Sequence, residues 1–143
     1  MNRSIRWLLA TLILAGSATV PRGPAATQEA AATFLGTYTC VQGPTAAKLR
    51  IVDARDDQRL EAIFAFGPTP GNPSVPTGSF LMEGRLDRGG RAILLQPTLW
   101  LQQPRGFNMI GLIGQIDDAF RTIEGNVLHG TACTTFSLHR ARR

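Results

Sequence analysis

Side chains suited to binding another molecule gather in one proline-bounded stretch of the chain. Residues 97–106 contain Trp100, Gln103 and Arg105, and Phe107 follows directly. Trp and Arg in a loop offer a large apolar area and directed hydrogen-bond donors, and both types are enriched at the energetic centres of protein interfaces. We therefore predict a binding surface formed by these four residues. In the alternative interpretation, Trp100 folds over one end of the domain and closes it as an apolar plug.

Residues that commonly carry out catalysis are few, and none forms a recognisable motif. The two histidines, His129 and His139, have no acidic neighbour at an informative spacing. The aspartates fall mostly at predicted turns, where capping of backbone amides already explains them. The chain has no glycine-rich phosphate loop, no Gly-x-Ser-x-Gly elbow and no His-Glu metal motif. We therefore predict a protein that is not an enzyme and has neither a cofactor nor a metal site. A hydrolase of cell-wall material, with two carboxylates facing each other across a cleft, is a weaker alternative.

Residues 1–26 have the composition of a secretory signal. Arg3 and Arg6 precede an apolar run, and small residues follow at 16–18 and 24–26. The apolar run ends near Val20 after about 14 residues, whereas a membrane-spanning helix needs roughly 20. We expect cleavage and export to the periplasm or the extracellular space, with no stable membrane insertion afterwards; an uncleaved anchor is the alternative. The remaining chain then divides into a linker at 27–34, a folded domain at 35–139 and a basic tail at 140–143.

The chain contains two cysteines, Cys40 and Cys133, one near each end of the predicted domain. An even number of cysteines in an exported chain indicates a disulfide, and two cysteines permit a single intramolecular pairing. Neither has a second Cys or a His at metal-ligand spacing, which argues against a zinc or redox site. The sequence therefore predicts a Cys40–Cys133 disulfide that encloses nearly the whole domain.

The net charge of +5 does not describe the predicted domain. Of the fifteen basic residues, three lie in the signal and three in the tail, which leaves nine basic residues against ten acidic ones. A nearly neutral body provides no extended basic face for contacts with phosphates. Nucleic acid is therefore excluded as an expected partner.

Short runs with alternating apolar residues, separated by turn residues, make up the domain. The expected strands cover residues 35–41, 47–54, 59–66, 79–86, 91–96, 107–116, 120–128 and 132–139, with irregular stretches at 67–78 and 97–106. No ten-residue segment of the domain shows helical periodicity. These features predict an all-β fold: a small antiparallel up-and-down barrel of about eight strands closed by the disulfide, with a β-sandwich as the alternative. The side chains expected to fill the interior are Phe64, Phe66, Phe80, Met82, Leu94, Leu112, Phe136 and Leu138.

Two segments of the domain, residues 84–93 and 114–123, share one pattern, and we call them the twin segments. In each, a Gly is followed by an aliphatic residue, an Asp, an Arg and an Ile at the same spacings. Residues 84–93 contain Gly84, Asp87, Arg91 and Ile93; residues 114–123 contain Gly114, Asp117, Arg121 and Ile123. Asp favours turns because its side chain bonds downstream backbone amides. We therefore predict two hairpins of one sheet, with a structural role.

Several motifs together carry a resemblance to known proteins. They are Gly36-Thr-Tyr-Thr-Cys40-Val-Gln-Gly43, Val75-Pro-Thr-Gly-Ser-Phe80, Pro97-x-x-Trp100 with Pro104-x-Gly106, Gly111-Leu-x-Gly114 and Cys133-x-x-Phe-x-Leu138. Over almost the whole mature chain, the sequence resembles a family of small exported bacterial all-β domains of unestablished function, which implies a fold but no activity. Tyr38-x-Cys40-x-x-Gly43 is also similar to periplasmic lysozyme inhibitors. Residues 77–80 of this chain match the inhibitory loop motif of those proteins only loosely. The Gly-x-Tyr opening and the Gly-x-Leu-Asp hairpin resemble avidin-like barrels, without a match to a biotin site.

Taken together, these patterns predict an exported, non-enzymatic binding module for a protein or a cell-envelope component. One alternative is a carrier of a small apolar ligand, because eight-stranded barrels can enclose one small molecule. The resemblance implies a further alternative, a lysozyme-inhibitor-like or cell-wall-acting protein.

Overall fold

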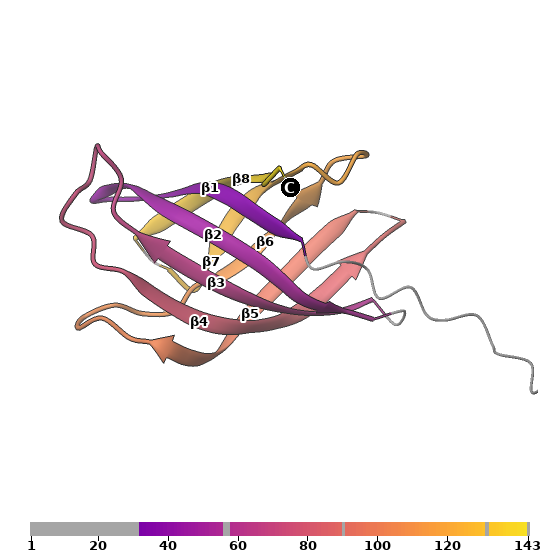
Figure 1. Cartoon of the computed structure of the whole chain (residues 1–143), viewed down its shortest axis with the longest axis horizontal. Coiled ribbons are helices and arrows are strands. Elements are labelled where there is room, and N and C mark those ends of the chain that lie inside the picture. Colours follow the sequence, from indigo (N-terminus) through magenta and orange to yellow (C-terminus); the bar gives the residue numbers. More distant parts are fainter. Residues whose placement is uncertain (1–31, 56–57, 90, 131, 143) are drawn as a thin grey trace, which may run out of the picture.

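The fold consists of eight antiparallel strands. The computed structural model describes residues 32–55, 58–89, 91–130 and 132–142. Its strands are β1 (Thr33–Cys40), β2 (Gly43–Ala54), β3 (Arg59–Gly67), β4 (Gly78–Asp87), β5 (Ala92–Gln102), β6 (Gly111–Ile116), β7 (Thr122–Leu128) and β8 (Cys133–Arg140). Each strand pairs with the next, and β8 pairs with β1, so the sheet closes on itself (Figure 1). This confirms the predicted all-β up-and-down barrel and not the β-sandwich.

The beginning of the chain lies largely outside the described residues. The predicted signal at 1–26 and most of the predicted linker at 27–34 fall there. β1 already begins at Thr33, two residues before the expected start of the domain. No helix in the described part of the chain is long and apolar enough to cross a membrane.

The disulfide lies where the barrel closes. β1 and β8 pair in antiparallel register, with Tyr38 opposite Phe136 and Cys40 opposite Cys133. A Cys40–Cys133 disulfide joins the two strands across a sequence separation of 93 residues. The predicted disulfide is thereby confirmed, and it connects the first strand covalently to the last.

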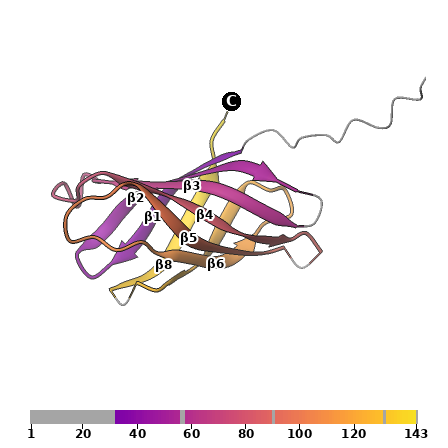
Figure 2. The same cartoon turned by 90° about the horizontal axis from the view of Figure 1, so that it is seen from below.

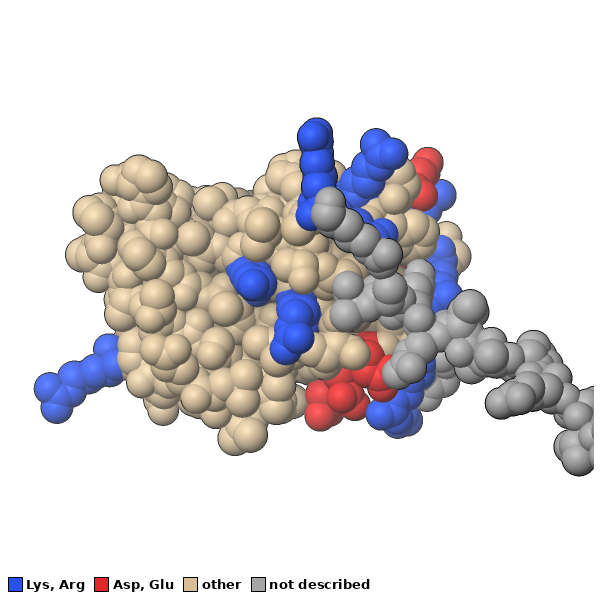
Figure 3. Space-filling view, in the orientation of Figure 1, with Lys and Arg blue, Asp and Glu red and all other residues tan. Residues whose placement is uncertain are grey.

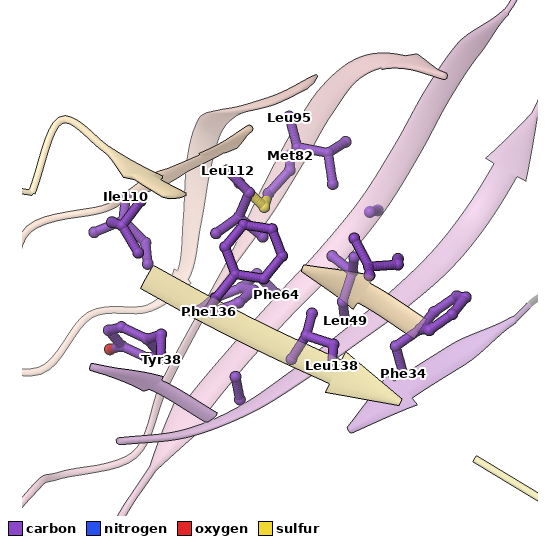
Figure 4. Close-up of a cluster of buried hydrophobic side chains, with 14 of the residues drawn as sticks. Phe34, Tyr38, Leu49, Phe64, Met82, Leu95, Ile110, Leu112, Phe136 and Leu138 are labelled. Carbon is purple, nitrogen blue, oxygen red and sulfur yellow. The ribbon is translucent and has the colours of Figure 1, made fainter. Parts of the chain in front are cut away.

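Apolar side chains fill the interior of the barrel. Alternate residues of each strand point inward, as the period of two requires, and they meet on the barrel axis (Figure 4). Phe64, Met82 and Leu138 are each 0 % exposed. One member of the predicted interior set is wrong: Leu94 is 38 % exposed, while its neighbours Ile93 and Leu95 are buried. The two neighbours are themselves aliphatic, so alternation alone did not show which face of this strand is internal.

Residues 97–106 are only partly irregular, which corrects the prediction. β5 continues to Gln102 and pairs with β4, with Pro97 opposite Met82 and Trp100 opposite Phe80. The register shifts twice along this pairing, between Ser79 and Phe80 and between Leu81 and Met82. Such irregularities allow a strand to accommodate a proline, whose missing N–H would otherwise interrupt the ladder. β6 correspondingly begins at Gly111 and not at residue 107.

Both twin segments form hairpins, as predicted. The Asp87 Oδ1 atom accepts a hydrogen bond from the Gly89 amide at 3.0 Å. The Asp117 Oδ1 atom accepts bonds from the amides of Thr122 and Arg121 at 2.9 and 2.6 Å. Because these two amides stabilise the carboxylate, they lower the pKa of Asp117 below its ordinary value. Ile93 and Ile123, the last matched positions, are both buried.

Candidate functional site

All four predicted site residues lie at one end of the barrel. This loop end is formed by the connections at 41–42, 68–77, 103–110 and 129–132. Figures 1 and 2 show the two longest of these connections, 68–77 and 103–110, side by side at the left. The opposite turn end carries the connections at 55–58, 88–91 and 117–121, together with the start of β1 and the end of β8.

Trp100 and Phe107 close the loop end with an aromatic cluster. The Trp100 ring meets Phe80 and Phe66 edge-on, with centroid distances of 5.3 and 6.3 Å. Phe107 stacks against the same Phe66 ring, with centroids 5.5 Å apart and planes inclined by 18°. Both geometries are favourable for aromatic pairs. Trp100 and Phe107 remain partly exposed, so the cluster combines the plug with an accessible aromatic surface.

Gln103 and Arg105 lie beyond this cluster and are both exposed. Both belong to the connection at 103–110. This connection begins beside the proline-rich connection at 68–77, because the Gln102 Nε2 atom donates to the Thr77 Oγ1 atom at 3.4 Å. The proline-rich connection is joined in turn to β2, since the Thr69 Oγ1 atom donates to the Pro44 carbonyl oxygen at 3.0 Å. The two long connections are therefore joined where β5 ends and β4 begins.

Charge is distributed unequally between the two ends. Arg105 is the one charged residue in the four connections of the loop end. Ion pairs of Arg55 with Asp53 and Glu61, and of Arg91 with Asp118, lie at or near the turn end. In the view of Figure 3, basic and acidic side chains gather toward the turn end, while the loop end is almost entirely uncharged.

The structure also brings Asp117, which is predicted to lie at a turn, into one groove with Glu124 of β7. An open groove of about 470 Å³ at the turn end is lined by Arg91, Asp117 and Glu124, among others. Asp117 accepts the two backbone bonds of its turn, and the Glu124 Oε1 atom accepts a bond from the Ser137 hydroxyl at 2.9 Å. Both carboxylates therefore already have local structural partners. The sequence signal for this groove is the Asp of the twin segment at 114–123 together with Glu124, which directly follows that segment.

An apolar pocket of about 60 Å³ opens at the turn end. Phe34, Leu86 and Ile123 lie in its wall, and Phe120 and Arg140 also line it. Phe120 has a positive φ of 52°, a conformation that bulky residues rarely adopt. Small-molecule sites usually enclose about 300–1,000 Å³, so this pocket accommodates only a small apolar group.

Both histidines lie on the surface and contact neutral side chains. The His129 Nε2 atom lies 2.7 Å from the Gln96 Oε1 atom, and the His139 Nδ1 atom lies 3.3 Å from the Thr122 Oγ1 atom. Among the described residues, no three His, Cys, Asp or Glu side chains gather in a group that could hold a metal ion.

Comparison of the chain with protein-family models, curated proteins and solved structures gave no match. The resemblances to small exported bacterial domains, to lysozyme inhibitors and to avidin-like barrels therefore stay predictions from the sequence.

Proposed function

We propose that this chain is an exported, non-enzymatic binding module whose loop end contacts a protein or a component of the cell envelope. The observation that carries the proposal is the aromatic cluster at the loop end, which holds the partly exposed Trp100 and Phe107 in place close in the chain to the exposed Gln103 and Arg105. Aromatic and Arg side chains that are held in place before binding lose little conformational entropy when a partner arrives.

The surroundings of this surface support contact with another macromolecule. The two long connections provide a broad surface with a single charged side chain, Arg105. Depletion of charge around aromatic and Arg residues is typical of the centre of a protein interface. The disulfide between Cys40 and Cys133 is compatible with an oxidising compartment, which supports export to the periplasm or the extracellular space.

The filled barrel weighs against the carrier alternative. Phe64, Met82 and Leu112 are almost completely buried on the barrel axis, and the apolar pocket at the turn end measures about 60 Å³. A typical ligand of a small-molecule site needs several times this volume. We therefore place the binding function on the outer surface of the loop end.

Photo-crosslinking tests this assignment without disturbing the aromatic plug. A photoreactive amino acid replaces Gln103, which is exposed, and in a control variant it replaces Lys48, which is exposed on β2. Each variant is irradiated with envelope extract, and adducts are identified by mass spectrometry. We expect a discrete adduct from position 103 that is absent from position 48, and we expect Arg105→Ala to reduce its yield by about 5- to 30-fold, as for an interface anchor.

Two results would contradict the proposal. Equal labelling from positions 103 and 48 would show that the loop end has no special role in binding. A discrete adduct from position 48 alone would place the contact on the barrel wall. Trp100→Ala is unsuitable as the main test, because its contacts with Phe66 and Phe80 make a loss of packing inseparable from a loss of binding.

A further inference from the structure

β5 extends past its neighbour β6. Its pairing with β6 covers Ala92 to Leu95 and stops there, whereas its pairing with β4 continues to Gln102. Residues 96–102 therefore have no ladder partner on the β6 side, and we call them the free edge of β5. In Figure 1 the β5 arrow continues to the lower left beyond the point at which β6 begins.

In the described part of the chain, the backbone hydrogen bonds outside the strand ladders do not involve residues 96–102. The connection that follows crosses the barrel mouth, where Phe107 stacks on Phe66, and its backbone bond runs between Phe107 and Pro104. The outward side chains Thr98, Leu99 and Leu101 are exposed. A strand edge of this kind presents unpaired N–H and C=O groups on which another strand can form a ladder.

An apolar stripe accompanies this edge. Leu94, Leu99 and Leu101 are 38, 58 and 51 % exposed, and they make up three of the seven large exposed apolar side chains in the described part of the chain. β5 contains no charged residue at all. Proteins usually protect exposed edges with charges, prolines and irregular pairing. Here Pro97 and the two register shifts toward β4 are present, but the charges are absent.

We propose that the free edge of β5 pairs antiparallel with the same edge of a second copy of this chain. A two-fold axis near Trp100 sets Leu99 opposite Leu101 of the second copy, and Thr98 opposite Gln102 of the second copy. Apolar side chains then meet apolar ones, and polar side chains meet polar ones. Because the edge is uncharged, two copies approach without like-charge repulsion. A two-fold contact in which each copy uses the same patch is the commonest arrangement of homo-oligomers.

The test measures the mass of the exported chain in solution. Sedimentation velocity from about 1 to 200 µM should show a monomer–dimer equilibrium in the range of a weak transient interface. Leu99→Lys should raise the dimer dissociation constant about tenfold or more, because it places a charge in the apolar contact. Leu35→Lys is the matched control: Leu35 is 47 % exposed, but β1 is paired on both sides, so the equilibrium should not change.

Hydrogen exchange provides another measurement at the same concentrations. Backbone amides in residues 98–102 should exchange more slowly in the dimer than after dilution, whereas amides of β1 should not respond to concentration. A chain that stays monomeric throughout would overturn the proposal and leave a strand from a different protein as the occupant of the edge. A dimer that responds equally to Leu99→Lys and Leu35→Lys would place the contact elsewhere and overturn it as well.

Discussion

Tyr38, the single tyrosine of the chain, links the loop end to the core. Its ring meets Phe64 edge-on at a centroid distance of 5.8 Å. Phe64 in turn contacts the ring of Phe80, and Phe80 contacts the ring of Trp100. A line of aromatic rings thus runs from the barrel interior to the exposed cluster. Burial raises the pKa of Tyr38 to about 12, and the adjacent Thr45 hydroxyl offsets part of the increase.

This environment predicts a loss of stability at alkaline pH. The unfolded phenol ionises with a pKa near 10.0 and the folded one near 12, so the unfolded state binds fewer protons between these pH values. The free energy of unfolding should therefore fall by about 2 kcal/mol as pH rises from 10 to 12. Tyrosinate absorbance near 295 nm reports this group alone, and Tyr38→Phe should abolish the signal. A midpoint near pH 10 in the folded protein would contradict the burial argument.

At the scale of the strand, the sequence predicted best where residues alternate cleanly. Phe64 and Phe66, two residues apart on β3, are predicted to lie inside the barrel and are both buried. The prediction of β5 was too short, because Pro97 indicated that the strand ends there. The register shifts that accommodate this proline depend on the pairing with β4, which the sequence around Pro97 does not show. The contacts of Trp100 with Phe66 and Phe80 join residues far apart in the chain, so local patterns could not choose between plug and binding anchor. The structure shows Trp100 packed against Phe66 and Phe80, as a plug requires; the binding role stays a prediction.

The first residue of each twin segment, Gly84 or Gly114, lies where the neighbouring strand approaches closely. A Cβ atom at Gly84 would overlap the carbonyl oxygen of Leu94 across the β4–β5 ladder, and one at Gly114 would overlap that of Glu124. Glycine in a strand commonly marks such a close approach of another backbone. The first residue of each segment is therefore set by the closeness of the neighbouring strand.

We expect Gly84→Ala to lower the free energy of unfolding by about 2 kcal/mol or more, since the added methyl group must displace backbone of β5. Gly71→Ala is the matched control, because a Cβ there meets only the Pro44 ring at 3.9 Å; its effect should stay within about 0.5 kcal/mol. Urea unfolding of both variants provides the measurement. Equal losses in the two variants would show that the close approach of the β5 backbone to Gly84 does not determine the effect.

At the scale of the whole molecule, the barrel separates two environments. The turn end has short connections with many charged residues, and the loop end has long connections with Arg105 as its one charge. A filled apolar interior lies between the two ends. The disulfide joins β1 to β8 near the loop end, where Cys40 and Cys133 pair. The proposed binding surface at the loop end is therefore supported by a barrel whose first and last strands are joined by a disulfide.

That closure predicts how the whole barrel responds to reduction. The disulfide spans a sequence separation of 93 residues, and restricting so long a loop in the unfolded chain stabilises the fold by on the order of 4–5 kcal/mol. The β1–β8 ladder and the apolar core remain without it, so the reduced chain should still fold, with a lower urea midpoint. Unfolding with and without reductant measures the difference, and the double variant Cys40→Ala/Cys133→Ala should be insensitive to reductant. Free thiols in the folded exported chain, or an unchanged midpoint on reduction, would show that barrel closure depends on the ladder alone.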